Sequence, residues 1–258
     1  MSLVDFVPMS QLKFILLLIF FITSSNFAQN KDTNSTASPG SESRDELEKK
    51  NSATYLEKSH YREISYVFKD RLIQDIRSLG IIVGNFGKDV DGSTQSLEKI
   101  RNDYQSSVRY HYRRAYVVSG KGMLDIYKDV DSLYQKFALV YEKQADDLLI
   151  ETVDQLTALE QIELEQNKSQ NRDSRLKDIE DAKFKLKIAY FQMARGDEMI
   201  RDRRYADSLV HFRLAKGYAI KTQTDLVIDE AKKKELIDKN IVHLTDNRNQ
   251  NSNLEKAK

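Results

Sequence analysis

The sequence predicts an all-α protein, an elongated helical array built from a few long helices. Proline occurs only twice in 258 residues, at Pro8 and Pro39, so from residue 40 onward no proline interrupts a helix. Glycine is also scarce, with nine residues in the chain. Charged residues make up 31% and hydrophobic residues 40%, a mixture typical of exposed amphipathic helices. We therefore expect few elements, each of them long.

The first 28 residues have the composition of a signal peptide. An uninterrupted apolar run covers residues 14–22, and Lys13 precedes it. Nine apolar residues suit the core of a signal peptide better than a membrane span, which needs about 20. We expect cleavage after Ala28, with Met9 as an alternative start of translation. The other interpretation is an uncleaved anchor or a buried apolar helix. After cleavage we expect no stable membrane span and an extracytoplasmic protein, either periplasmic or secreted.

The chain contains no cysteine, which bears on both stability and chemistry. Disulfides, a lipid-modified cysteine behind the leader and thiol nucleophiles are all excluded, so the fold depends on helix packing. The net charge is +1, from 41 basic and 40 acidic residues. This balance predicts no overall attraction to polyanions.

The first part of the mature chain divides into a linker and the start of a helical domain. Residues 29–44 are polar and predict a disordered linker, and residues 45–244 predict the helical domain. Its first helix is expected over residues 45–79, where Gly80 is placed to end it. Residues 81–92 then form a glycine-rich break.

A second and a third helix are expected after this break. Ser93 or Thr94 is placed to cap the second helix, and Gly120 with Gly122 predicts a turn or kink that ends it. Residues 123–166 contain nothing that breaks a helix pattern. A helix of that length is about 65 Å long at 1.5 Å per residue, which favours an elongated molecule.

Two sets of side chains repeat every seven positions in the first half of this long helix, which aligns each set on one helix face. The apolar set is Ile126, Leu133 and Val140, and the aromatic set is Tyr127, Tyr134 and Tyr141. The simpler interpretation is packing against another helix of the same chain. The alternative is that the tyrosines form part of an assembly surface, because tyrosine combines apolar area with a hydroxyl group.

A helical hairpin is expected over about residues 176–240. Its connection, residues 201–204, is short, so the two helices must lie antiparallel. The apolar pattern fades beyond Ile241, and residues 245–258 predict a disordered tail.

Residues 189–220 of this hairpin resemble a tetratricopeptide unit. The resemblance is carried by Gly196, Tyr205, Ser208, Leu209, Phe212 and Ala215. The sequence departs from the motif at Arg195, Met199 and Ile220. Because no second unit follows at a 34-residue spacing, the resemblance implies a tetratricopeptide-like hairpin inside a larger helical body. As a whole, an exported, cysteine-free and tyrosine-rich helical chain also looks like the periplasmic flagellar sheath or coiling proteins of spirochaetes, without a shared signature motif.

Basic and aromatic residues alternate in residues 108–116, where Arg109, Arg113 and Arg114 lie among tyrosines. Cations and rings together are typical of single-stranded nucleic acid binding, but export argues against that partner, and we predict no nucleic acid. A solvated face, an extracytoplasmic polyanion and an acidic protein remain as interpretations. The acidic helix face of Asp147, Glu151 and Asp154 is a candidate complementary surface in a neighbouring copy.

The sequence offers little for catalysis. Residues 87–98 partly match a calcium loop, but Gly87 stands at the first ligand position. Glu57 and His60 form half of a di-iron motif, and no second Glu-x-x-His exists. Nothing resembles a nucleophile–base pair or a phosphate loop. We predict no catalytic, cofactor-binding or metal-binding residues, and hence not an enzyme.

These observations predict an exported, non-enzymatic structural or protein-binding protein of an extracytoplasmic assembly, of which a periplasmic flagellar sheath is one example. Its expected partners are proteins, with self-association included. The predicted interaction surface consists of Tyr127, Tyr134, Tyr141, Arg109, Arg113 and Arg114. The alternative is a surface or secreted ligand-binding module for a host protein or a polyanion.

Overall fold

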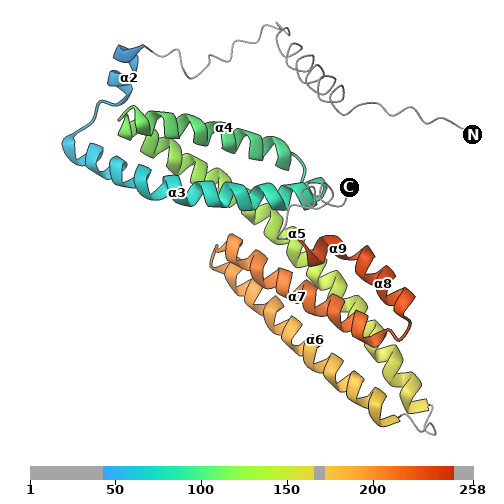
Figure 1. Ribbon diagram of the computed structural model, residues 1–258. Helices are drawn as coiled ribbons and strands as arrows, with labels where there is room; N and C mark the ends of the chain where they lie inside the picture. The colour runs from blue at the N-terminus through green and yellow to red at the C-terminus, as the bar shows by residue number, and fades with distance from the viewer. Residues whose placement is uncertain (1–42, 166–171, 247–258) are drawn as a thin grey trace, which may run out of the picture. The chain divides into compact units, whose positions relative to one another are not determined.

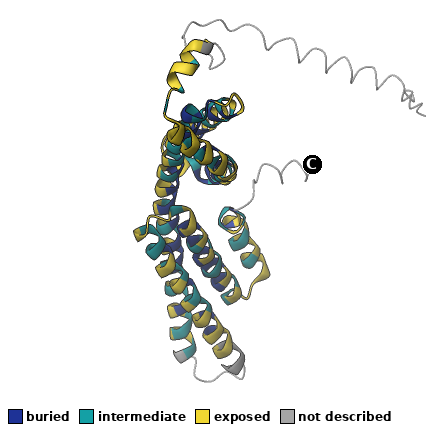
Figure 2. Ribbon diagram, turned by 90° about the vertical axis from the view of Figure 1, so that its left-hand side faces the viewer, coloured by how far each residue is buried: buried dark blue, intermediate teal, exposed yellow. Residues whose placement is uncertain are grey.

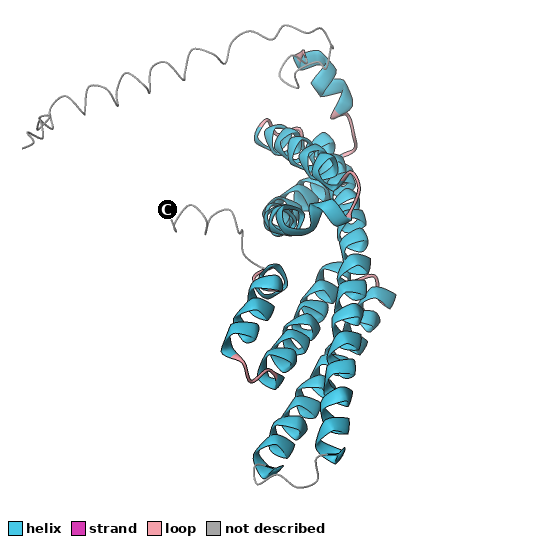
Figure 3. Ribbon diagram, turned by 90° about the vertical axis from the view of Figure 1, so that its right-hand side faces the viewer, coloured by secondary structure: helices cyan, strands magenta, loops and turns pink. Residues whose placement is uncertain are grey.

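The computed structural model describes residues 43–165 and 172–246, all within one compact unit (Figure 1). Every regular element in these two ranges is helical, and no strand occurs there (Figure 3). The helices are α2 (Arg44–Lys50), α3 (Tyr55–Phe86), α4 (Ser93–Tyr112), α5 (Tyr116–Glu165), α6 (Arg172–Arg201), α7 (Tyr205–Leu226), α8 (Glu230–Lys239) and α9 (Ile241–Leu244), with a 3₁₀ turn, η1 (Gly87–Asp89), after α3. The all-α prediction is confirmed. The expected signal peptide, the linker up to residue 42 and residues 247–258 lie outside the described residues.

Helix α5 organises the unit. It has 50 residues, or about 75 Å at 1.5 Å per residue. Its first half packs with α3 and α4, and its second half with α6 and α7 (Figure 1). One long helix that is shared by two helix pairs makes the unit an elongated array, as the uninterrupted pattern predicts.

The main core is a continuous apolar cluster that α3, α4, α5 and α7 share. Figure 2 shows the buried residues on the facing sides of these helices. The largest fully buried side chains include Leu72 and Leu79 of α3, Ile100 of α4, and Phe137 and Tyr141 of α5. Two smaller clusters continue the core where α5 packs against α6 and α7. Burial of this apolar surface is the main force that holds the array together.

The expected single helix from residue 45 is in fact two helices, and Gly80 does not end the second one. Thr54 and Glu57 form a capping box that starts α3: Glu57 N–H donates to Thr54 Oγ1 at 3.3 Å, and Thr54 N–H donates to Glu57 Oε2 at 2.9 Å. Helix α3 then continues through Gly80 to Phe86. Ile82 and Phe86 are buried in the core, and their packing outweighs the cost of about 1 kcal/mol for a glycine inside a helix.

The turn predicted at Gly120 and Gly122 is wrong, because both residues lie inside α5. They serve close helix packing instead. A Cβ atom at Gly120 would lie 2.8 Å from the main-chain oxygen of Tyr61 in α3, and one at Gly122 would collide with the side chain of Ser107 in α4. The chain actually turns before α5, at residues 113–115.

Two helix connections share one main-chain geometry with an arginine in the left-handed region. Arg114, between α4 and α5, has φ = 60°, and Arg203, between α6 and α7, has φ = 58°. At each connection the arginine N–H and the next N–H donate back into the preceding helix, in the pattern of a Schellman motif. Glycine is the usual residue at this position, so each arginine carries a conformational cost of about 1 kcal/mol. The α6–α7 connection lies where the sequence predicts it.

Candidate protein-binding surfaces and a buried charge cluster

The tyrosines of α5 pack inside the chain. Tyr134 and Tyr141 are buried, and Tyr127 is partly buried against Phe68, with 5.3 Å between ring centroids. The Tyr134 hydroxyl donates to the main-chain oxygen of Asp75 at 3.3 Å, which ties α5 to α3. The structure therefore agrees with the simpler interpretation of this stripe. Tyr134 and Tyr141 have no surface left for a partner protein.

Arg109, Arg113 and Arg114, which we call the arginine cluster, are exposed at the end of α4 and in the turn that follows. Within the described residues none of the three guanidinium groups forms an ion pair or a hydrogen bond through its side chain. Exposed charges without an internal partner are free to bind an external anion. Tyr112, with 72% of its surface exposed, lies next to them in the chain.

A buried histidine, His111, packs against α3 and α5 next to the arginine cluster. His111 Nδ1 lies 2.9 Å from Ser65 Oγ of α3, and the His111 ring makes edge contacts with the rings of Tyr66 and Tyr116. Burial, together with the nearby charges of Lys69 and Arg62, lowers the pKa of His111 below its usual 6.5, so the imidazole is neutral at pH 7. One feature of the sequence indicates this role, since His111 lies three residues after Val108 on the apolar face of α4.

Further cations surround the same end, each above a tyrosine ring. Arg62 Cζ lies 5.6 Å from the ring centroid of Tyr116, and Lys69 Nζ lies 5.9 Å from that of Tyr112. Contacts of this kind contribute about 0.5–1 kcal/mol each at exposed sites, and they restrict where the cations point. The arginine cluster thus belongs to a wider basic and aromatic surface.

An acidic surface lies farther along α5. Asp147 and Asp154 are exposed, without an ion pair or hydrogen bond to other described residues, and Ile150 between them is 52% exposed. We call these three residues the acidic stripe. Glu151 of the predicted face is partly engaged, with its Oε1 3.9 Å from Lys239 Nζ of α8. From the start of α5 at Tyr116 to Asp147 is 31 residues, or about 46 Å, so the stripe cannot reach the arginine cluster of the same copy.

A buried charge cluster connects the segment after α9 to α5 and α7. Lys216 of α7 and Asp246 have no exposed surface, and Lys216 Nζ lies 3.5 Å from Asp246 Oδ2. Arg213 Nε lies 2.5 Å from Asp246 Oδ1. Lys216 also donates to Gln144 Oε1 at 3.1 Å. The carboxylate therefore has two cations beside it inside the protein.

Burial shifts the pKa values of these groups. It lowers the pKa of Lys216 from its usual 10.5 to about 8, against the attraction of Asp246. It raises the pKa of Asp246, against the attraction of Lys216 and Arg213. A lysine with a lowered pKa is a feature of some nucleophilic sites, but no substrate can reach a side chain without exposed surface. This cluster is structural.

The predicted tail begins too early in the sequence, because residues 245 and 246 belong to the folded unit. Asp246 is fully buried, and its main-chain oxygen accepts a hydrogen bond from Asn85 Nδ2 of α3 at 3.1 Å. The ring of His243 stacks on Phe86, with 5.5 Å between centroids. Sequence periodicity misses such a lone charged residue, because it has no apolar pattern around it.

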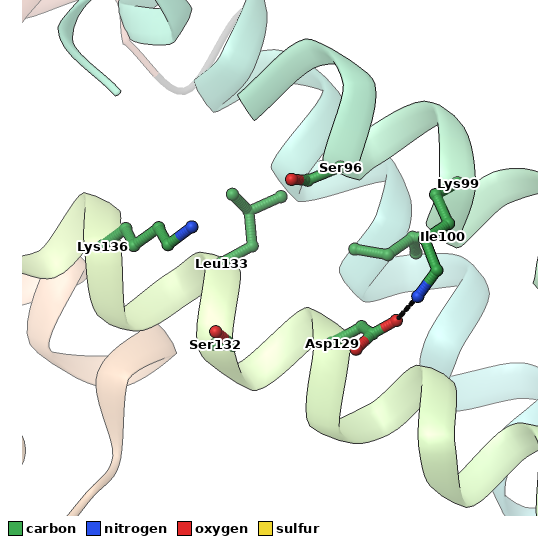
Figure 4. Close-up of a pocket in the computed structure, with 7 residues that line it drawn as sticks. All are labelled: Ser96, Lys99, Ile100, Asp129, Ser132, Leu133 and Lys136. Carbon is green, nitrogen blue, oxygen red and sulfur yellow. Dashed lines mark hydrogen bonds and ion pairs between the residues drawn. The ribbon is translucent and has the colours of Figure 1, made fainter. Parts of the chain in front are cut away.

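A small cavity of about 130 Å³ lies between α4 and α5 (Figure 4). Figure 4 shows Lys99 and Asp129 joined across it, with Lys99 Nζ 2.6 Å from Asp129 Oδ2. At about 30 Å³ per water, the cavity has room for roughly four molecules. It is too small for an organic substrate. Elsewhere among the described residues, no group of three or more His, Cys, Asp or Glu side chains converges as a metal site would require.

Comparison with known proteins adds no relative. No family model matches the chain, and no match was found among curated proteins or solved structures. The tetratricopeptide-like hairpin and the spirochaete relationship therefore stay predictions. Among the described helices, none combines the length and the apolar character that a bilayer crossing demands.

Proposed function

We propose that this protein is an exported, non-enzymatic subunit of an extracytoplasmic assembly, and that its copies associate head to tail. In this arrangement the arginine cluster of one copy binds the acidic stripe of the next. The observation that carries the proposal is the presence of two exposed patches of opposite charge in one chain, neither of which is neutralised within the described residues.

The two patches suit a contact between copies in three respects. Their charges are complementary, which steers association and fixes register. Ile150 adds an exposed apolar side chain at the centre of the acidic stripe. Because the two patches differ, the contact is heterologous, and a heterologous contact that does not close into a ring produces an extended filament. A periplasmic flagellar sheath is an assembly of this general kind.

Charge reversal tests the proposal. In Arg109→Glu/Arg113→Glu both patches are acidic, and in Asp147→Lys/Asp154→Lys both are basic. We expect the wild-type protein to associate at ~0.05 M salt and to dissociate at ~0.5 M, since exposed charges are screened over a few ångströms at high ionic strength. Each variant alone should remain monomeric, and an equimolar mixture should associate again. Size-exclusion chromatography with multi-angle light scattering measures all four samples.

Lys232→Glu/Lys234→Glu is the matched control. It makes the same change of net charge at two exposed lysines of α8 whose side chains form no ion pair or hydrogen bond with other described residues, so it should associate like the wild type. A wild-type protein that stays monomeric at low salt would refute the proposal. So would a mixture of the two reversed variants that stays monomeric while the wild type associates.

The second candidate is a surface or secreted module that binds a polyanion or an acidic host protein. The exposed ring of Tyr112 beside Arg113 favours it, because rings and cations together bind extended anionic ligands. In that case the monomeric protein should bind a sulfated polysaccharide in a salt-dependent manner. Arg109→Glu/Arg113→Glu should abolish this binding, whereas Asp147→Lys/Asp154→Lys should retain it.

A further inference from the structure

A second feature of the structure is a cleft of about 300 Å³, which lies away from the two patches above. One wall is formed by α3 and α5, and the other by the α6–α7 connection and the first turn of α7. Its volume equals that of about ten waters at ~30 Å³ each, which is the lower end of the range for small-molecule sites. The cleft is therefore large enough for a small metabolite.

The charges that line the cleft are equal in number, and most are already paired. Arg71 Nε lies 3.9 Å from Asp75 Oδ2, and Arg204 Nη2 lies 2.7 Å from Asp207 Oδ2. Arg71 is held further by the ring of Tyr127, with Cζ 5.3 Å from the ring centroid. These contacts leave one carboxylate and one guanidinium group in the lining, those of Asp131 and Arg203, without an ion pair among the described residues.

The two unpaired groups lie on opposite walls. Asp131 is a residue of α5, and Arg203 belongs to the connection between α6 and α7. Asp131 is partly buried, and burial raises the pKa of its carboxyl group. A ligand cation next to it would offset this shift. Arg203 is held in the left-handed region, with φ = 58°, where glycine would be less strained.

We propose that this cleft binds a small zwitterion of the amino acid type, with its ammonium group at Asp131 and its carboxylate at Arg203. The match is one of charge and size. A ligand with no net charge but one positive and one negative end pairs both unpaired groups at once and leaves the net charge of the cleft unchanged. A simple anion or cation would pair only one of them.

Isothermal titration calorimetry with each of the twenty L-amino acids, at concentrations up to ~10 mM, tests the proposal. We expect at least one amino acid to bind. Its N-acetyl derivative and its amide, which each lack one of the two charges, should both bind at least tenfold more weakly. Failure of every amino acid to bind, or equal binding of the blocked derivatives, would overturn it.

Three variants separate binding from folding. Arg203→Gly removes the cation and relieves the backbone strain, so it should raise the temperature of unfolding and weaken binding at least tenfold. Arg114→Gly makes the same change at the other left-handed connection, outside the cleft, and should raise the temperature of unfolding with binding unchanged. Asp131→Asn should also weaken binding at least tenfold. If Arg203→Gly and Asp131→Asn both bind like the wild type, the assignment is wrong. Arg109→Glu/Arg113→Glu should bind normally, so this test and the association test can fail independently.

Discussion

The ammonium group of Lys216 lies over the ring of Tyr141, with Nζ 3.7 Å from the ring centroid, and neither side chain has exposed surface. The Phe86 ring lies on another side of the same Nζ, at 4.7 Å from its centroid. Two rings, the Gln144 amide oxygen and the Asp246 carboxylate thus replace the water that this cation would have outside the protein.

Removal of the carboxylate should destabilise the protein strongly. Asp246→Ala leaves Lys216 as a buried cation without its counter-charge, and we expect the free energy of unfolding to fall by about 3–5 kcal/mol. Urea denaturation followed by circular dichroism measures the change. The double variant Lys216→Met/Asp246→Ala removes both charges and should be more stable than Asp246→Ala. If the second substitution lowers stability further, the two groups are not coupled in this way.

Stability should depend on pH through His243. Burial, together with the nearby charge of Lys216, lowers the pKa of His243 from 6.5 to about 4. Between pH 4 and pH 6.5 the unfolded chain binds more protons than the folded protein. The contribution of His243 to the free energy of unfolding is therefore present above pH 6.5 and is lost as the pH falls toward 4. The raised pKa of Asp246 has the opposite effect on stability, because there the folded protein binds more protons than the unfolded chain as the pH falls. The comparison therefore needs a variant that keeps Asp246.

His243→Phe keeps a ring for stacking on Phe86 and does not titrate. The stability of the wild type relative to this variant should decrease when the pH is lowered from 7 to about 4.5. Urea midpoints of both proteins at the two pH values measure this difference. A difference that stays constant with pH would show that His243 titrates normally in the folded protein.

Gly196 in α6 should not tolerate a larger residue. A Cβ atom there would collide with the ring of Phe212, with Cδ1 and Cζ at 2.7 Å, and Phe212 is fully buried. We expect Gly196→Ala to lower the free energy of unfolding by about 1–3 kcal/mol. Gly217, in the interior of α7, has no atom within 4 Å of an added Cβ, so Gly217→Ala should raise stability by about 0.5–1 kcal/mol. Chemical denaturation gives the free energy of unfolding of the two variants. Equal changes in both would contradict close packing of Gly196 against Phe212.

The left-handed arginine of the α4–α5 connection predicts a stabilising substitution. Arg114→Gly should raise the free energy of unfolding by about 1 kcal/mol, because glycine adopts φ = 60° without strain. Arg113, one residue earlier, has φ = −81°, and Arg113→Gly should give no such gain. Thermal unfolding of both variants measures the effect. A gain at both positions would point to charge repulsion within the arginine cluster instead of backbone strain.

The fold class and the long helix can be predicted from the sequence because both depend on the absence of residues that break helices. Without proline after Pro39, and with an unbroken pattern from residue 123, a helix as long as α5 is the natural outcome. Individual glycines are a weaker guide. Gly80, Gly120 and Gly122 predict breaks, yet all three lie inside helices, and at Gly120 and Gly122 a neighbouring helix approaches closely. The turn before α5 was missed because an arginine occupies the position that usually holds glycine.

The exposure of the candidate surface residues follows from the sequence only in part. The arginine cluster is exposed, as the alternation of basic and aromatic residues suggests, but Tyr134 and Tyr141 are buried. A seven-residue spacing places side chains on one face without indicating which face meets another helix. Asp131 and Arg203 are 72 positions apart, and only the fold brings them to the same cleft.

Helix α5 has a further consequence for any assembly of this protein. Between the arginine cluster and the acidic stripe the chain is one continuous helix, in which each residue adds about 1.5 Å and a rotation of about 100°. The number of α5 residues between Tyr116 and Asp147 therefore sets both the distance and the angular offset between the two surfaces. Each residue added to this part of α5 would move the two surfaces about 1.5 Å farther apart and rotate one about 100° relative to the other, so the spacing and twist of the proposed filament are set by this part of the helix.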